Sequence, residues 1–196
     1  TGAVPLERIK NELRQYFSIQ KNNLYQNIIE KKAYKLISSN PVLNFAPSAL
    51  NETEKYFDLN KIWFIYTALL LVNSDFENEK LNLTAAEKKT LREVKALVLN
   101  PPGSSNLSIY NAFIDTQELS PAIYYAITRD KAVLKFYKAL NQVKVLITGR
   151  DLINLGLLPS PIFKKLFEEV LKQKLEGRLN TKEQEIAFVK NYINFD

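Results

Sequence analysis

The Lys and Arg side chains of this chain are its most informative candidates for a functional site, because spaced basic side chains can bind phosphate groups. The 196 residues include 27 Lys and Arg against 21 Asp and Glu, a formal net charge of +6. Residues 129–196 hold 13 of the basic residues and 8 of the acidic ones, so most of the excess charge lies in the last third. A basic surface of this kind is typical of nucleic-acid-binding proteins, although a solvated lysine-rich surface produces the same pattern.

Three groups of basic residues are the candidates for contact with phosphate. One group lies on a predicted helix near residue 90, a second is spaced to share one helical face, and a third lies around residues 150–165. The candidates are Lys88, Lys89, Arg92, Lys131, Lys135, Lys138, Arg150, Lys164 and Lys165. The last two fall in the first turn of a helix predicted to begin at Pro161, where free backbone N–H groups also attract anions.

Several other kinds of site are excluded by composition. The chain has no His and no Cys, which excludes disulfides, histidine and thiolate metal sites, cysteine nucleophiles and Ser-His-Asp triads. Its five glycines form neither G-x-G-x-x-G nor a P-loop. Asp75, Glu77 and Glu79 are the nearest approach to a Mg2+ site, and we interpret them as a solvated loop. We therefore expect no catalytic residue, metal or cofactor in this chain.

Helical spacing of apolar residues predicts an all-α fold, an array of roughly eight to ten short helices with no β-sheet. Glycine-rich turns and sustained alternation of apolar and polar residues, which indicate strands, are missing. The predicted helices cover about 6–19, 24–37, 52–57, 61–73, 85–99, 107–115, 121–128, 131–143, 151–155, 161–176 and 181–193. The apolar run at 62–72 is about half the ~20 residues that a bilayer-spanning helix needs, so it predicts a buried helix and no membrane contact.

Local signals predict where several helices begin and end. Thr84-Ala85-Ala86-Glu87 has the form of a capping box. Asn60, Ser120, Asp130 and Ser160 are predicted caps, and Thr148 or Gly149 starts a short helix. Gly156 and Gly177 are predicted to close helices.

The segment Asn100-Pro-Pro-Gly-Ser-Ser105 breaks the helical pattern and predicts a division of the chain. Residues 1–100 and 101–196 then form two helical regions, or pack as one unit if this segment is an ordinary surface loop. Residues 1–10 lack the pattern of a signal peptide, so we expect a cytoplasmic protein. The absence of Met predicts a processed product or an excised part of a longer protein.

The most specific stretch of sequence is residues 147–161, Ile-Thr-Gly-Arg-Asp-Leu-Ile-Asn-Leu-Gly-Leu-Leu-Pro-Ser-Pro. It is followed by Leu175-Glu176-Gly177 and Asn180-Thr181-Lys182-Glu183, and a weaker match is Leu-Asn-Leu-Thr-Ala-Ala-Glu-Lys-Lys at 81–89. These residues resemble the C-terminal body and tail of the bacterial CCA-adding tRNA nucleotidyltransferase and poly(A) polymerase family, over about 60–193. Ser160 stands where that family usually has Gly.

The resemblance implies an RNA-binding part without the catalytic head, which in that family transfers CMP or AMP to an RNA 3′ end with Mg2+. Residues 1–100 would be neck- or body-like and 101–196 tail-like, and the chain would hold tRNA, or another RNA 3′ region, through its phosphates. We expect Gly149, Asp151, Gly156 and Pro161 to be architectural and Arg150, Lys164 and Lys165 to touch the ligand. A lack of His rules out carrying over phosphohydrolase activity.

The alternative interpretation is a helical protein–protein interaction or oligomerisation module with no role in nucleic-acid binding. A homodimer and a contact with an N-terminal catalytic domain both stay open from the sequence.

Overall fold

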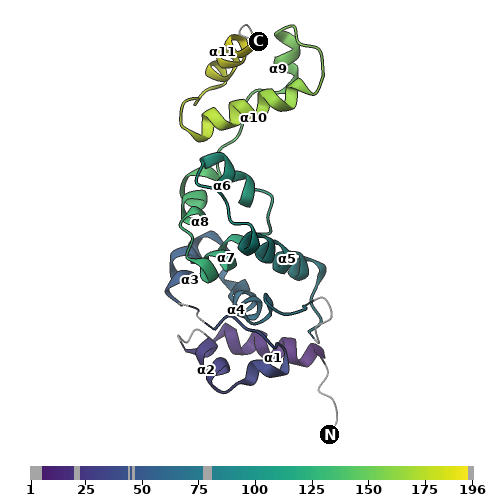
Figure 1. Ribbon diagram of the computed structural model, residues 1–196, viewed down its shortest axis with the longest axis vertical. Helices are drawn as coiled ribbons and strands as arrows, with labels where there is room; N and C mark the ends of the chain where they lie inside the picture. The colour runs from purple at the N-terminus through teal and green to yellow at the C-terminus, as the bar shows by residue number, and fades with distance from the viewer. Residues whose placement is uncertain (1–5, 20–22, 44, 46, 77–80, 194–196) are drawn as a thin grey trace. The chain divides into compact units, whose positions relative to one another are not determined.

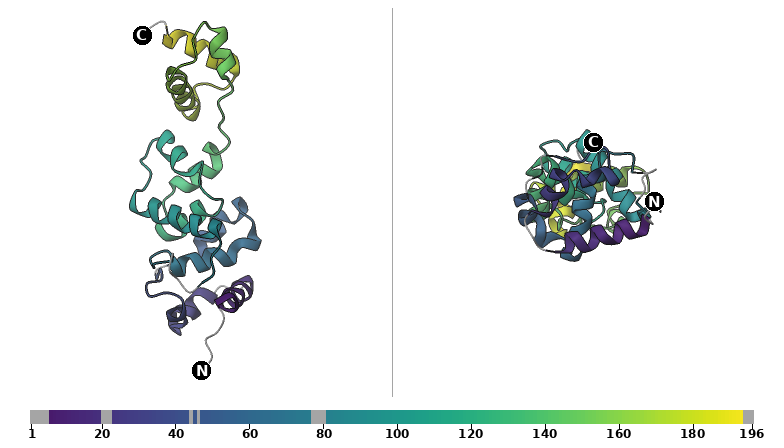
Figure 2. Two further views of the ribbon diagram at one scale, coloured as in Figure 1. Left: turned by 90° about the vertical axis from the view of Figure 1, so that its right-hand side faces the viewer. Right: turned by 90° about the horizontal axis from the view of Figure 1, so that it is seen from below.

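The computed structural model describes residues 6–19, 23–43, 45, 47–76 and 81–193, and these residues form helices joined by turns and loops (Figures 1 and 2). The predicted all-α class is confirmed, since no strand occurs in the described ranges. The α-helices are α1 (Leu6–Ser18), α2 (Leu24–Glu30), α3 (Ser48–Thr53), α4 (Ile62–Leu71), α5 (Ala85–Leu99), α6 (Asn106–Phe113), α7 (Ser120–Thr128), α8 (Ala132–Lys135), α9 (Gly149–Asn154), α10 (Ile162–Leu175) and α11 (Lys182–Ile193). Short 3-10 turns cover Ala33–Leu36, Glu54–Tyr56 and Leu59–Lys61, and a π turn covers Phe136–Leu140.

The chain divides into two compact units that are not continuous in sequence. The first unit consists of Thr1–Pro102 and Ala112–Leu134, and the second consists of Gly103–Asn111 and Lys135–Asp196. The chain therefore leaves the first unit near Pro102, returns to it, and leaves again after Leu134. Division into a body-like and a tail-like region stays a prediction, because these units are defined by packing alone.

Helix α4 is the centre of the first unit. It is apolar on all sides, and eight of its ten residues are buried, as expected for a helix surrounded by other elements. Helices α1 and α7 pack against it, and the rings of Phe17 and Tyr66 stack with centroids 4.9 Å apart. None of the helices in the described part of the chain combines the length and apolarity needed to cross a membrane.

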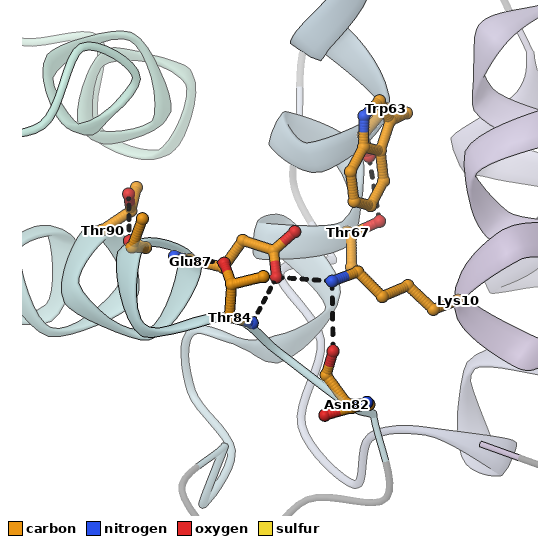
Figure 3. Close-up of polar contacts among 8 residues, drawn as sticks. Lys10, Trp63, Thr67, Asn82, Thr84, Glu87 and Thr90 are labelled. Atoms are coloured by element: carbon orange, nitrogen blue, oxygen red, sulfur yellow. Dashed lines mark hydrogen bonds and ion pairs between the residues drawn. The ribbon is translucent and has the colours of Figure 1, made fainter. Parts of the chain in front are cut away.

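The predicted capping box at the start of α5 is confirmed. The Thr84 side-chain oxygen accepts a hydrogen bond from the Glu87 N–H at 3.2 Å, and Oε2 of Glu87 accepts from the Thr84 N–H at 2.6 Å. The same Oε2 accepts from Nζ of Lys10 at 2.6 Å, and this ammonium also donates to the Asn82 carbonyl at 3.1 Å (Figure 3). Glu87 thus closes a local cap and also joins α1 to α5.

Three of the predicted caps are wrong and one is confirmed. Asn60 donates its N–H to the Asp58 carboxylate in the turn before α4, and Ser120 lies inside α7, where its hydroxyl donates to Glu93. Ser160 offers its backbone carbonyl, not its side chain, to the Phe163 N–H. Asp130 does cap α8, accepting from the Ala132 N–H at 2.9 Å. In each of the three failures the observed hydrogen bond differs from the side-chain cap that the rule assigns.

The single helix predicted over 24–37 is broken. Helix α2 ends at Glu30, Lys32 adopts a left-handed conformation with φ of 55°, and the 3-10 turn Ala33–Leu36 follows. Apolar spacing cannot reveal such a break, because a positive φ at a residue with a Cβ leaves the hydrophobic pattern unchanged.

We predict that Lys32→Gly stabilises the protein. Glycine removes the left-handed penalty of roughly 1–2 kcal/mol and costs about 0.5–1 kcal/mol of chain entropy, so the free energy of unfolding should rise by about 0.5 kcal/mol. Lys31→Gly is the matched control, because Lys31 is right-handed, and it should lower stability by about 0.5–1 kcal/mol. Urea denaturation measures both, and equal destabilisation by the two variants would contradict the prediction.

Candidate nucleic-acid interface

A buried carboxylate lies at the centre of the second unit. Glu185 on α11 is fully buried, next to a core formed by Ile147, Leu152, Leu166, Val170 and Val189. Its Oε2 accepts hydrogen bonds from the backbone N–H groups of Leu146 and Ile147 at 2.8 and 2.9 Å. Its Oε1 pairs with Nζ of Lys174 on α10, whose side chain is also buried. A buried ion needs such complete pairing, so Glu185 holds the chain just where residues 147–161 begin.

Asp151 makes a second connection between this motif and α11. Its Oδ2 accepts from the N–H and the hydroxyl of Thr148 at 2.7 and 2.8 Å, which closes the start of α9. Its Oδ1 lies 2.8 Å from Nζ of Lys182 in the first turn of α11. Hydrogen bonds from Lys182 and then from Thr148 lower the pKa of Asp151 to about 2. The carboxylate therefore stays ionised and paired at neutral pH.

The predicted glycine ends of α9 and α10 are confirmed. Gly156 and Gly177 have φ of 88° and 73°. Each helix closes with the two hydrogen bonds of a Schellman motif, Gly156 N–H to the Ile153 carbonyl and Leu157 N–H to the Leu152 carbonyl in the first case. Pro161 precedes α10, and a Cβ added at Gly149 would lie 3.8 Å from the Phe163 ring. All four predicted architectural residues thus lie at turns or helix starts.

Three of the candidate basic residues lie on α9 and α10, namely Arg150, Lys164 and Lys165. Arg150 is exposed on α9. Lys164 is 84% exposed on α10, and its Nζ lies 3.9 Å from Oε1 of Glu168, which is also exposed. Nζ of Lys165 lies 5.6 Å from the centre of the Tyr192 ring of α11. Exposed ion pairs of this kind contribute little stability, so Lys164 can exchange its partner for a phosphate at little cost.

The other candidates are divided between the units. Lys88, Lys89, Arg92 and Lys131 belong to the first unit, and Lys135 and Lys138 belong to the second with Arg150, Lys164 and Lys165. Lys89 pairs with Glu93 at 3.7 Å on α5.

The α-helix predicted over 131–143, which would place Lys131, Lys135 and Lys138 on one face, is not continuous. Helix α8 covers only Ala132–Lys135, so Lys131 precedes it. Lys138 lies in the π turn that follows, where the Asn141 N–H donates to the Phe136 carbonyl five residues back. The expected face assumed 3.6 residues per turn, and a π turn is wider.

Sequence reasoning missed Glu185 and Lys174. The signal was present, because Glu185 stands four residues before the buried Val189 and so occupies a core position of α11. A charged residue at such a position indicates a buried partner. Glu77 and Glu79, two of the three carboxylates considered for Mg2+, lie outside the described residues. Among the residues that are described, no group of three or more His, Cys, Asp and Glu could hold a metal ion.

Comparison with known proteins gives one distant relative. The chain is 24% identical over 119 residues to an A-adding tRNA nucleotidyltransferase from Halalkalibacterium halodurans. The matched segment covers 57% of this chain and 28% of the relative, so the chain spans little more than a quarter of that protein. No family model matches the chain, and no solved structure matches it. The match links the chain distantly to a tRNA nucleotidyltransferase.

We predict that Glu185→Gln destabilises the second unit. The change leaves the buried Lys174 ammonium without a counter-charge, and breaking a buried ion pair costs about 3–5 kcal/mol. Hydrogen exchange at amides of α9–α11 should therefore accelerate at least about a hundredfold. Glu176→Gln changes the same residue type at an exposed position of the same unit and should leave exchange almost unchanged. Equal exchange in the two variants would contradict the role of Glu185.

Asp151 predicts a pH dependence of stability. Its pKa is about 2 in the folded chain and about 3.9 when unfolded, so the folded state favours the ionised form. The stabilisation is complete above the unfolded pKa and is lost as the pH falls through the folded pKa. Asp151→Asn should therefore be less stable than the unmodified chain at neutral pH, and the difference should shrink between about pH 5 and pH 2. Urea denaturation across this range measures it, and a constant difference would be evidence against the pairing.

Proposed function

We propose that this chain is the RNA-binding, all-α C-terminal part of a tRNA nucleotidyltransferase-like protein, and that it holds tRNA through its phosphate backbone. The observation that carries the proposal is the position of the excess charge. Residues 129–196 have 13 basic and 8 acidic residues, and the same region presents the exposed Arg150, Lys164 and Lys165. Similarity to a tRNA nucleotidyltransferase supports tRNA as the class of ligand.

The second unit suits binding by charge and shape. Two of its carboxylates, those of Glu185 and Asp151, form ion pairs with Lys174 and Lys182. Because their charges are compensated, they repel an approaching phosphate less. Lys164 is nearly fully exposed. Contacts to phosphate position an RNA without reading its sequence, and double-stranded RNA is recognised mostly in this way.

In this proposal, a separate head domain that is not part of this sequence carries out catalysis. That head would transfer CMP or AMP from CTP or ATP to the RNA 3′ end with Mg2+, while the chain described here positions the RNA. The described residues do not themselves form a metal-binding group, so no step of that reaction is assigned to them. The proposal places the protein in the cytoplasm and includes a contact with the catalytic head.

A second function, protein–protein contact, is favoured by one specific observation. Leu158 is 82% exposed, and Ile153 and Ile162, on either side of it in sequence, are 50% and 40% exposed. Contiguous exposed apolar patches mark interaction sites, and we propose that these three side chains form one. A homodimer or a heterologous partner would then cover these residues.

Fluorescence anisotropy of labelled tRNA at several salt concentrations tests the proposal. Neutralising about four phosphates should give a slope of log affinity against log salt of roughly −3 or steeper. Lys164→Glu with Lys165→Glu should weaken binding at least about tenfold and flatten the slope by about 2. The control is Lys172→Glu with Lys190→Glu, which makes the same charge change at exposed positions of the same unit.

The outcomes separate the two functions. An equal loss in both double variants would place the effect in net charge alone and contradict the assigned contacts. Absence of saturable binding even at low salt, with a molecular mass that rises with concentration, would replace RNA binding with the protein-interaction function.

A further inference from the structure

A cavity of about 250 Å3 lies within the first unit, and all of its lining residues belong to that unit. Its walls come from the start of α4, the first turns of α5 and the turn before α7. The lining residues are Lys61, Trp63, Phe64, Ala86, Glu87, Thr90, Gln117, Glu118 and Leu119. A space of this size lies just below the range of ordinary small-molecule sites, so it suits one planar ring.

The apolar part of the cavity is aromatic. Trp63 and Phe64 of α4 are 8% and 4% exposed and lie next to each other with ring centroids 5.6 Å apart. Nζ of Lys10 and Cζ of Arg14 lie 5.9 and 5.8 Å from the centre of the Trp63 ring. Figure 3 shows Trp63 on α4 together with Glu87 and Thr90 on α5. Aromatic rings favour the stacking of a flat ring such as a nucleobase. Lys10 is already paired with Glu87, so Arg14 is the cation beside Trp63 that can attract an anionic group attached to that ring.

Two polar groups at the cavity have hydrogen-bonding capacity to spare. Glu87 uses Oε2 for Lys10 and Thr84, and its Oε1 has no hydrogen-bond partner among the described residues. Gln117 donates its backbone N–H to Glu93, while its side-chain amide has no partner within the same described set. The cavity therefore offers a carboxylate oxygen that accepts and an amide that both donates and accepts.

We propose that this cavity binds a single amine-bearing nucleobase, with its ring against Trp63 and Phe64. Adenine, cytosine and guanine have an exocyclic amine that can donate to Glu87, and each has a ring edge that can pair with the Gln117 amide. Uracil has no exocyclic amine and offers the carboxylate only its ring N3–H, so we expect it to bind more weakly. The attached phosphate stays outside the cavity, near the exposed Arg14. It also lies near the half-exposed Lys61, which pairs with Glu118 and would exchange this exposed partner for the phosphate.

The base can belong to a free mononucleotide or to an unpaired nucleotide of a bound RNA. Only the second source rests on the proposed function, because a mononucleotide site requires no RNA binding by the second unit. The two sources need separate measurements.

Trp63 makes the test direct, because it is the only tryptophan in the chain. Intrinsic fluorescence is titrated with AMP, CMP, GMP and UMP, with free N-acetyltryptophanamide correcting for light absorption and collisional quenching. We expect saturable quenching by AMP, CMP and GMP, and an affinity for UMP at least about fivefold weaker. Quenching identical to that of the free indole for all four nucleotides would overturn the proposal.

A matched pair of variants locates the site. Ala86→Leu adds a larger side chain at a cavity-lining position, whereas Ala85→Leu makes the same change at the exposed neighbouring residue that does not line the cavity. Ala86→Leu should abolish saturable quenching and Ala85→Leu should preserve it. Gln117→Leu, which keeps the size of the side chain but removes the amide, should weaken AMP binding at least about tenfold. If Ala86→Leu fails to fold, Gln117→Leu tests the site instead. Unchanged AMP binding by Gln117→Leu would contradict the proposed contact with the edge of the base.

A titration with labelled tRNA separates this proposal from the proposed function. Saturable mononucleotide quenching without tRNA binding would support the cavity as a free-nucleotide site and overturn RNA binding. Salt-dependent tRNA binding without nucleotide quenching of Trp63 would leave the RNA function standing and overturn the nucleobase site. If RNA supplies the base, a single-stranded oligonucleotide should quench Trp63 in the Ala85→Leu protein and not in the Ala86→Leu protein.

Discussion

The Glu185 carboxylate imposes the strongest constraint on the second unit. A fully buried ion is tolerated only when its lone pairs are occupied and its charge is compensated, and here two backbone N–H groups and the Lys174 ammonium meet that demand. Together with Glu185 on α11, these groups come from three parts of the chain, the other two being the loop at residues 146–147 and α10. The segment that leads into the 147–161 motif is thereby held by one residue, which lies 39 and 38 positions beyond Leu146 and Ile147.

The arrangement of charge follows from that constraint. Glu185 and Asp151 are paired with lysines, whereas Arg150 and Lys164 are exposed at the surface. Glu87 obeys the same logic in the first unit, where one oxygen closes a cap and binds Lys10 while the other is left for the cavity. Each unit thus uses an acidic side chain to join segments that are distant in sequence, residues 146–147 with α11 in one case and α1 with α5 in the other. We propose that each also has a surface or cavity that receives part of a nucleotide.

The residue types of the candidate interface could be predicted from the sequence, but their grouping in the folded chain could not. Residue types indicate which side chains can bind phosphate, and the exposed positions of Lys164 and Arg150 agree with an amphipathic pattern. The grouping could not be predicted, because Lys131 falls in one unit and Lys138 in the other. The cavity at Trp63 had no signal in the sequence, since its walls come from three segments separated by more than twenty residues.

The features that depend on neighbours within about one helical turn could be predicted from the sequence alone. These are the all-α class, the capping box at Thr84, the buried helix α4 and the left-handed glycines that close α9 and α10. Tertiary structure alone decided the features that depend on distant partners, among them the hydrogen bond from Ser120 to Glu93 and the burial of Glu185. The physical reason is range, because propensity and capping act over a few residues, whereas a buried polar group takes whichever partner the packing brings to it.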